Sequence, residues 1–488
     1  MAMLPVSRSI RFSLLAGSML LPPVPAHAAD QTQLIADLQR QIDELKAEVR
    51  AMRAAAPAAV PAGQPVATGA ASPPAAAAQL AAAAPAPVQA TPVTVSANHA
   101  EGQKRPKEWY ERLQLRGYVQ VRQNEQIAGA KDAPPGVSRL RSVHDAGFGD
   151  AGNFELRRAR LVVQGDVSRL MSVYVQAELA AAVNAQSNGE RREHFLQMRD
   201  AYADFHFADR QATLRVGQSK VPFGWENLQS SSNRIAIDRA DAANSAVPGE
   251  RDLGAVLYYT PSRVQAIWDR LAADRQKLFG NYGALGFGVF NGQGINRAEK
   301  NDGLVKVAMV SWPFRLDRLG TPFAGQVLEI GAQGMLNTVQ PELRSGGVSP
   351  VAIEERRVNL HAVLYPNPIG FQTEWTWGRG PEWNRAAQAI TEAPLNGGYV
   401  QVMARIAYSS KGLLMPYARW QTYDGGWKAA TNAPRVSTRE IELGVEWQPA
   451  KEVELTVAYV RSRRSEADER RSGIAEGQLI RTQLQFNY

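Results

Sequence analysis

The alternation of apolar and polar residues is clearest in the last segment of the chain, from Glu476 to Tyr488. Mostly apolar side chains occupy one set of alternate positions and polar ones the other, namely Ile480, Thr482, Leu484, Phe486 and Tyr488 against Arg481, Gln483, Gln485 and Asn487. A two-residue period places each set on one face of a β-strand. In a transmembrane barrel such a strand pairs at its edge and contacts lipid with its apolar face. A half-buried strand of a soluble β-sandwich is the alternative for this segment alone.

Similar alternation recurs in about sixteen segments from Trp109 to Tyr488, a number within the range of outer-membrane barrels. The connections between these segments are short and long in turn. The short ones are Asp166–Arg169, Ala208–Gln211, Pro366–Ile369, Ser409–Gly412 and Pro449–Glu452. The long ones are Asn124–Asn153, Ala182–His194, Pro222–Glu250, Gly378–Leu395, Asp424–Val436 and Arg464–Gly477.

Short turns at one end and long loops at the other are how outer-membrane barrels are built. The pattern therefore predicts an all-β fold, an antiparallel transmembrane β-barrel of about 16 strands in residues 109–488. One connection departs from this rule. Pro261–Tyr282 stands where a short turn is expected, yet it is long and has a helical pattern from Val264 to Leu278.

The composition agrees with a barrel and excludes several other classes of protein. After the first thirty residues no apolar run approaches the roughly 18–20 residues of a membrane helix, which excludes a helical membrane protein. The chain has no cysteine, so disulfides and thiolate sites are excluded. Its net charge is +8 and its basic residues are scattered, so nucleic-acid binding is not favoured. The six histidines form no catalytic or metal-binding motif, and we expect no enzymatic activity, cofactor or metal.

Three segments precede the predicted barrel. Residues 1–28 combine Arg8 and Arg11, a short apolar run and an Ala26-His27-Ala28 site, which predicts a secretory signal peptide. Residues 29–53 predict a periplasmic coiled-coil helix, and residues 54–108, rich in Ala and Pro, predict a disordered linker. The β-branched a positions with Leu at d favour a dimer of this helix. The seam residues are Ile35, Leu38, Ile42, Leu45, Val49 and Met52.

Alternation also predicts which basic side chains point into the barrel. Guanidinium groups offer a donor fork to phosphate and carboxylate oxygens, and rings of basic residues are what an anion-selective pore requires. The residues assigned to the pore are Arg116, Arg158, Arg160, Arg215, Lys220, Arg234, Arg239, Arg357, Arg405, Arg419 and Arg481. The alternative is that these residues pair with inward acids and only stiffen the wall. The inward acids are Asp200, Asp204, Glu178, Glu329, Glu442 and Glu454.

The long connection within Gly217–Asp252 is the most distinctive loop. It carries Lys220, Arg234, Arg239 and Arg251 among several acids. An empty lumen in so wide a barrel would be a large aqueous hole. We therefore hypothesise that this loop folds into the barrel and that its basic residues form a constriction. A loop on the outer surface is the alternative.

Three blocks of sequence resemble the phosphate-selective porin O and P family. Phe154–Leu161 contains Arg-Arg-Ala-Arg-Leu, is followed by Gly165, and looks like the family's R-R-A-R-L…G strand. The second block comprises Asp200–Tyr202 and Val216–Gly224 and resembles the family's D-A-Y…V-G-Q-x-K-x-P-F-G stretch. The third comprises Arg251–Gly254 and Gly288–Gly294 and resembles later blocks of the family. The resemblance covers roughly residues 109–488 and implies a usually trimeric outer-membrane porin that takes up phosphate or related anions. The N-terminal helix and the linker lie outside it.

Three functions are compatible with these features. The first is a passive outer-membrane diffusion channel for small anions, with phosphate or polyphosphate as solute and a homotrimer embedded in outer-membrane lipid as its form. The second is a porin of the same fold for a different small solute. The third is a structural role in which the N-terminal helix contacts the cell wall or another periplasmic partner and tethers the barrel to it.

Overall fold

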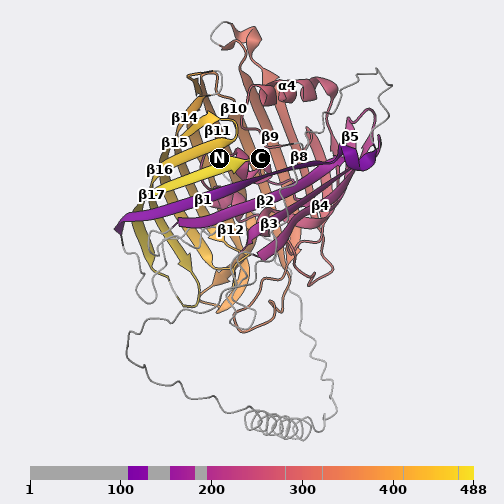
Figure 1. The fold of residues 1–488 in the computed structure, drawn as a ribbon. Coiled ribbons are helices and arrows are strands. Elements are labelled where there is room, and N and C mark those ends of the chain that lie inside the picture. The colour runs from indigo at the N-terminus through magenta and orange to yellow at the C-terminus, as the bar shows by residue number, and fades with distance from the viewer. Residues whose placement is uncertain are drawn as a thin grey trace, which may run out of the picture. The chain divides into compact units, whose positions relative to one another are not determined.

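The computed structural model describes residues 108–129, 154–181, 195–280, 282–320, 323–409, 412–470 and 472–488. Within these residues the chain forms one antiparallel sheet that closes on itself as a barrel (Figure 1). The closing contact joins β1 (Gln114–Gly129) to β17 (Ile474–Asn487), while the other edge of β1 pairs with β2 (Phe154–Asp166). The expected signal peptide and coiled-coil helix, and the expected linker up to residue 107, lie outside the described residues.

The strands run in sequence order around the barrel. Strand β13 (Ile406–Ala407) continues β12 along the same partner, β14, so the barrel wall has sixteen positions for its 17 strands, as the alternation predicts. The remaining strands are β3 (Met171–Ala181), β4 (Phe195–Phe207), β5 (Ala212–Lys220), β6 (Arg251–Tyr259), β7 (Leu285–Phe290), β8 (Val305–Arg315), β9 (Val327–Val339), β10 (Ile353–Leu364), β11 (Ile369–Asn384), β12 (Ala389–Ala404), β14 (Leu413–Gly426), β15 (Arg435–Ala450) and β16 (Val453–Ala467).

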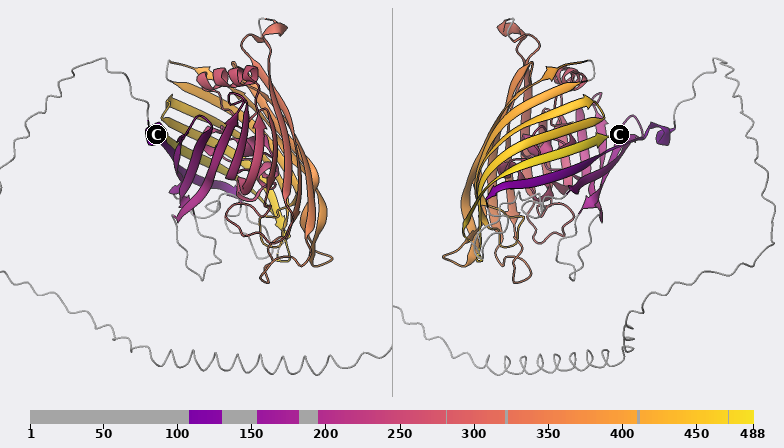
Figure 2. Two further views of the ribbon diagram at one scale, coloured as in Figure 1. Left: turned by 90° about the vertical axis from the view of Figure 1, so that its right-hand side faces the viewer. Right: turned by 60° about the vertical axis from the view of Figure 1, so that its left-hand side comes forward.

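The helical elements of the described residues are short, and all but one, which precedes β1, lie in the connections between strands. Among the described residues, no helix has the length and apolar character needed to cross a membrane. The longest is α4 (Ser262–Ala273), in the connection that the sequence marks as an exception; it lies at one end of the barrel (Figure 2). The others are η1 (Trp109–Arg112), α2 (Trp225–Leu228), η2 (Ser231–Asn233), α3 (Asp241–Asn244), η3 (Pro248–Glu250) and η4 (Asp317–Leu319).

The exposure of side chains is the reverse of that in a soluble sheet. In β10, Val358 is 53% exposed on the outer face, whereas Glu355 and Asn359 on the inner face are 1% and 0% exposed. In the middle of β10, apolar side chains therefore lie on the outer face and polar ones on the inner face, whereas the inner faces of β6, β8 and β9 also carry apolar residues such as Val256, Val307 and Met335. An apolar outer face suits contact with lipid, and polar inward positions suit an aqueous lumen.

Three of the expected long loops are shorter than the sequence suggests. The segment Gly378–Leu395 is mostly a β-hairpin, because β11 and β12 stay paired from Gly378↔Leu395 out to Asn384↔Ala389. Pairing likewise extends β14 and β15 to Gly426↔Arg435, and β16 and β17 to Ser465↔Ile474. Polar residues on both faces hide the apolar–polar alternation in these segments, but the backbone hydrogen bonds between the paired strands continue through them. We call this end of the barrel the long-loop end and the opposite end, with α4, the short-turn end.

Candidate functional site

The segment of residues 221–250, here called the constriction loop, lies inside the barrel. Most of its side chains are buried, and its contacts reach the wall on several sides. The hydroxyls of Ser231 and Tyr118 (β1) are 2.5 Å apart, and Asp238 accepts from Arg481 (β17) at 2.6 Å. Across the lumen, Glu226 accepts from Arg419 (β14), Ser245 from Arg357 (β10), and Trp225 donates to Glu329 (β9). The loop therefore folds into the barrel and spans the lumen, as expected from the sequence, while the expectation that its basic residues form the narrowest point stays a prediction.

Lys220, at the end of β5, holds the beginning of this loop. Its ammonium donates to the carbonyl oxygens of Asn227 and Gln229, each at 2.8 Å, and to that of Leu228 at 3.2 Å. The same ammonium lies 3.2 Å from the Glu250 carboxylate, at the end of the loop. Lys220 thus joins the two ends of the loop, and its donors are engaged within the protein.

Glu250 is the acidic centre of this anchor. Its carboxylate contacts Arg239 of the loop and, at 2.9 Å, Arg251 of β6. Burial alone would raise the pKa of Glu250, but the charges of Arg239, Lys220 and Arg251 outweigh burial and hold the pKa well below its usual value. Glu250 therefore stays ionised and neutralises part of this basic group.

The connection between β6 and β7 supports the constriction loop from the short-turn end. The indole N–H groups of Trp225 in the loop and Trp268 in α4 donate to the two oxygens of Glu329, at 2.7 and 2.8 Å. Beyond α4, the backbone carbonyls of Lys277 and Leu278 accept hydrogen bonds from loop side chains, at 3.0 and 2.6 Å. An apolar cluster inside the barrel joins the two segments; it includes Phe223, Trp225, Leu228, Val264, Trp268, Leu271 and Phe279.

Lys277 fixes this connection to the far wall. Its ammonium lies 2.9 Å from Glu446 of β15 and 2.8 Å from Glu454 of β16. Burial lowers the pKa of Lys277, but the two carboxylates outweigh burial and raise the pKa above its usual value. The long connection that the sequence left without a role therefore crosses the short-turn end and braces the loop.

Five arginines gather where the loop meets β1, β2 and β17. This arginine cluster consists of Arg122, Arg158, Arg160, Arg234 and Arg481, all buried. Two carboxylates offset it: Asp238 contacts Arg122 at 3.2 Å and Arg481 at 2.6 Å, and Glu178 contacts Arg160 at 2.8 Å. The cluster keeps an excess of positive charge.

Two members of the cluster have no carboxylate partner in the described part of the chain. Arg158 donates to the amide oxygen of Gln120 at 2.9 Å. The neighbouring charges that act on it most strongly are those of Arg157, Arg234, Arg160 and Arg122, while Asp238 and Glu178 interact with it more weakly. Arg234 is 6% exposed, and its Nε and Nη1 have no hydrogen-bond partner among the described residues. Burial, followed by the charge of Arg239, lowers the pKa of Arg234 to about 10, so it remains a cation at neutral pH.

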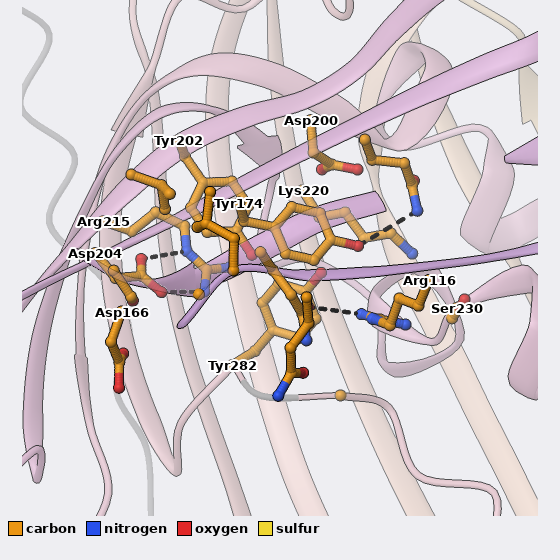
Figure 3. Close-up of a pocket in the computed structure, with 18 of the residues that line it drawn as sticks. Arg116, Asp166, Tyr174, Asp200, Tyr202, Asp204, Arg215, Lys220, Ser230 and Tyr282 are labelled. Atoms are coloured by element: carbon orange, nitrogen blue, oxygen red, sulfur yellow. Dashed lines mark hydrogen bonds and ion pairs between the residues drawn. The ribbon is translucent and has the colours of Figure 1, made fainter. Parts of the chain in front are cut away.

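A cavity of about 1020 Å³ opens at the short-turn end beside the loop. Figure 3 shows its lining, in which Arg215 lies against Tyr202 and forms two hydrogen bonds with Asp204, at 2.8 and 2.9 Å. The rings of Tyr174 and Tyr202 are stacked with centroids 5.0 Å apart, and the Arg215 guanidinium is 3.9 Å from the Tyr202 centroid. The cavity is thus a polar vestibule walled by aromatic rings.

The eleven basic residues assigned to the pore fall into four groups. Arg158, Arg160, Arg234 and Arg481 belong to the arginine cluster, and Lys220 and Arg239 surround Glu250. Arg116 and Arg215 line the vestibule. On the other side, Arg357 and Arg419 pair with Glu355 and Glu226, and Arg405 donates to the carbonyl of Asp274 at the short-turn end.

The inner wall is uneven in charge. Beyond the arginine cluster, the inner faces of β9–β16 carry several buried acids, namely Glu329, Glu355, Glu374, Glu442 and Glu446. Some of them pair with bases, as Glu355 does with Arg357 and Lys428. The alternative interpretation from the sequence, that acids pair with the basic residues, therefore describes this half of the barrel better than the half around β1 and β2.

Sequence reasoning missed three residues of the site. Arg122 continues the alternation of β1 and could have been included from that pattern alone. Arg157 lies at a shift in register, because Gln120 pairs with Arg158 while Val121 pairs with Leu156. Asp238 sits in an irregular loop, where no period assigns a direction. Among the described residues, no group of histidines and acids is arranged to hold a metal ion.

Comparisons with known proteins place these features in context. The family model described as phosphate-selective porin O and P matches residues 137–488. Among solved structures, OmpT from Vibrio cholerae in its trimer form aligns with a TM-score of 0.45 and 8% identity, over 77% of this chain and 99% of that one. The anion-selective porin from Comamonas acidovorans aligns with a TM-score of 0.44 and 13% identity, over 77% and 99% of the two chains. No match to a curated protein sequence was found.

Proposed function

The chain belongs to the phosphate-selective porin O and P family, and from this membership we propose that it is a passive channel for small anions, phosphate or polyphosphate in particular. Membership makes it an outer-membrane porin. The short turns of such barrels face the periplasm and the long loops face the outside. A solute that enters between the long loops therefore meets the constriction loop before it reaches the vestibule.

The observation that carries the proposal is the unpaired part of the arginine cluster. Arg234 has free donors in a buried setting, and Arg158 beside it has only a neutral partner. A buried donor without a partner is unfavourable, so an anion that supplies acceptor oxygens there gains hydrogen bonds that the empty site lacks. Phosphate has several such oxygens, and two guanidinium groups can share them.

Passage requires binding that is favourable but not tight. Asp238 and Glu178 serve this balance, because their two charges offset part of the charge of Arg122, Arg481 and Arg160 and so limit the field that holds an anion. Beyond the cluster, Arg116 and Arg215 offer further positive charge along the vestibule wall. The anion leaves through that vestibule into the periplasm.

The test replaces Arg234 by Gln and records reversal potentials in a planar bilayer under a KCl gradient, with phosphate titrated into the bath. Wild-type channels are expected to prefer anions and to lose chloride current as phosphate is added. Arg234→Gln should raise the phosphate concentration for half-block about tenfold, which corresponds to roughly 1.4 kcal/mol for one charged hydrogen bond.

Arg463→Gln is the matched control, because Arg463 is exposed on the outer face of β16, where it pairs with Glu476 at 2.8 Å. It should leave both the selectivity and the phosphate block unchanged. Cation selectivity of the wild type, or phosphate block that is equal in Arg234→Gln, contradicts the proposal.

A porin for a different small solute is the second candidate, and the acidic inner face of β9–β16 favours it. Positive charge on one side of a lumen and negative charge on the other orient dipolar solutes as well as anions. Weak selectivity for chloride over potassium, with no phosphate block, is the result that this candidate predicts.

We further propose that the barrel assembles as a homotrimer and that the N-terminal helix contacts the cell wall or another periplasmic partner. Family membership supports the trimer. The heptad seam Ile35–Met52 supports the second proposal. Chemical crosslinking in native membranes tests both, through the size of the linked species and through recovery of cell-wall fragments.

A further inference from the structure

The outer face of the barrel carries a furrow between β7 and β11. It has a volume of about 670 Å³ and an almost wholly apolar lining. The register places one row of outward side chains across it, with Phe287 beside Ala308, Ala308 beside Gly334, and Gly334 beside Val358. Trp377 of β11 completes the row. Cavities of about 300–1,000 Å³ are the usual size for a bound small molecule.

Small residues on β9 create the hollow. A Cβ atom built at Gly334 would meet no atom within 4 Å, so the space above this glycine is empty. Ala332 is the next outward residue along β9, and Ala308 flanks Gly334 on β8. Large exposed side chains stand on both sides, namely Phe287, Leu336, Val358 and Trp377. The furrow therefore has the narrow apolar form that suits a hydrocarbon chain lying along the strand.

A row of cations borders the furrow toward the long-loop end. The register places Lys306 beside Leu336, Leu336 beside Arg356, and Arg356 beside Arg379, all on the outer face. Neighbouring strands are about 4.8 Å apart, so these three cations lie within reach of one phosphorylated headgroup. The side chains of Arg356 and Arg379 are 61% and 44% exposed.

Acids near this row offset it only in part. Glu392 of β12 contacts both arginines, with Arg356 at 3.6 Å, and Glu354 is exposed one row further out. Lys306 has no ion pair within the described ranges. Three cations against two carboxylates leave a positive excess next to an apolar furrow. This arrangement is complementary to an anionic lipid, whose negative headgroup would contact the cations and whose hydrocarbon chain would contact the furrow.

We propose that this furrow binds a lipid of the outer leaflet that has a phosphorylated headgroup. One acyl chain lies over Gly334 and Ala332, and the phosphate is held by Lys306, Arg356 and Arg379. The long-loop end of an outer-membrane barrel faces the outside, so the headgroup row lies at the outer leaflet. The site is separate from the lumen and does not depend on which solute the channel carries.

The first test measures lipid A binding to the purified full-length protein by native mass spectrometry. Lys306→Gln, Arg356→Gln and Arg379→Gln remove the cations singly and together, and each charge lost should weaken binding about fivefold. Gly334→Leu places a branched side chain in the furrow, where a Cβ atom meets nothing within 4 Å, and should abolish binding while the cations remain. Dephosphorylated lipid A should bind the wild type as weakly as lipid A binds the triple variant.

Two control variants alter similar residues elsewhere on the outer face. Arg461→Gln with Arg463→Gln removes exposed cations of β16, and Ala177→Leu enlarges an outward residue of β3. Both should bind lipid A as the wild type does. Single-channel conductance should be unchanged in every variant, which separates failure of this proposal from failure of the proposed channel function.

Several results overturn the proposal. One is that the triple variant and Gly334→Leu both bind lipid A as strongly as the wild type does. Another is equal binding of the dephosphorylated lipid by the wild type. A third uses the absence of cysteine from the natural chain: if Gly334→Cys forms a disulfide-linked dimer in membranes, the furrow is a subunit interface and not a lipid site.

Discussion

At the scale of single residues, the arginines of the lumen differ in whether a carboxylate neutralises them. Arg215 has Asp204 and Arg419 has Glu226, and these pairs hold the wall and the loop. Arg234 has no such partner in the part of the chain that the structure describes. Arg215 and Arg419 each keep one buried nitrogen without a partner among the described residues, but their carboxylates repel an anion, so we expect an anion to bind at Arg234.

Glu250 provides a prediction at this scale. Glu250→Gln removes the charge that offsets Arg239, Lys220 and Arg251, which leaves buried cations without compensation. Loss of one partner of a buried ion pair is expected to lower the free energy of unfolding by about 3 kcal/mol. Urea unfolding in detergent, followed by tryptophan fluorescence, measures the difference. Glu452→Gln, at an exposed turn, is the control and should unfold as the wild type does.

The pH dependence of this difference follows from the lowered pKa of Glu250. A carboxyl whose pKa is lower in the folded than in the unfolded state stabilises the fold fully above its unfolded pKa, about 4.3 for glutamate. That stability is lost as the pH falls through the lower, folded pKa. The gap between the wild type and Glu250→Gln should therefore be constant from pH 8 to pH 5.5 and should narrow only in strong acid. A gap that narrows already near pH 6 would show that Glu250 is not held ionised.

At the scale of elements, the constriction loop and the connection that contains α4 form one unit inside the barrel. Trp225 and Trp268 both donate hydrogen bonds to Glu329, and side chains of the loop donate to backbone carbonyls in the segment after α4. A loop that crosses a lumen gains from support on its open side as well as from the wall strands that it contacts on several sides. The long insertion at the short-turn end supplies that support.

Trp268→Phe tests this unit. The variant keeps the apolar ring but removes one donor to Glu329, a buried carboxylate, and should destabilise the protein by about 1.5–3 kcal/mol. Because the loop shares Glu329, we expect more frequent conductance fluctuations in single-channel records. Asp269→Asn, on the exposed side of α4, should behave as the wild type. If Trp268→Phe shows no more conductance fluctuations than the wild type, the hydrogen bond from Trp268 is not needed to hold the loop in place.

At the scale of the whole molecule, the barrel and the N-terminal segments are expected to have separate roles. Deletion of residues 31–100, with the signal peptide kept, should leave ion selectivity and phosphate block unchanged. It should weaken oligomer stability or attachment to the cell wall, as measured by gel mobility and by recovery of the protein with cell-wall fragments. A change in selectivity on deletion would contradict this division of roles.

The sequence alone determined the barrel. Alternation of outward Leu115 and Val121 with inward Tyr118 and Gln120 needs only the two-residue period of a strand, and that period persists wherever one face meets lipid. It also placed Arg158, Arg160 and Arg481 on the inner face. The three porin-like blocks indicated the family that the comparison confirms.

Only the tertiary structure decided which of the inward charges are neutralised. Asp238 reaches Arg122 and Arg481 from an irregular loop, and Glu226 reaches Arg419 from nearly two hundred positions away in the chain. Such pairs depend on where a loop without a period folds, and on register shifts such as the one at Arg157. Periodicity fixes the direction of a side chain in a strand, but the partner of that side chain is fixed by the packing of the folded chain.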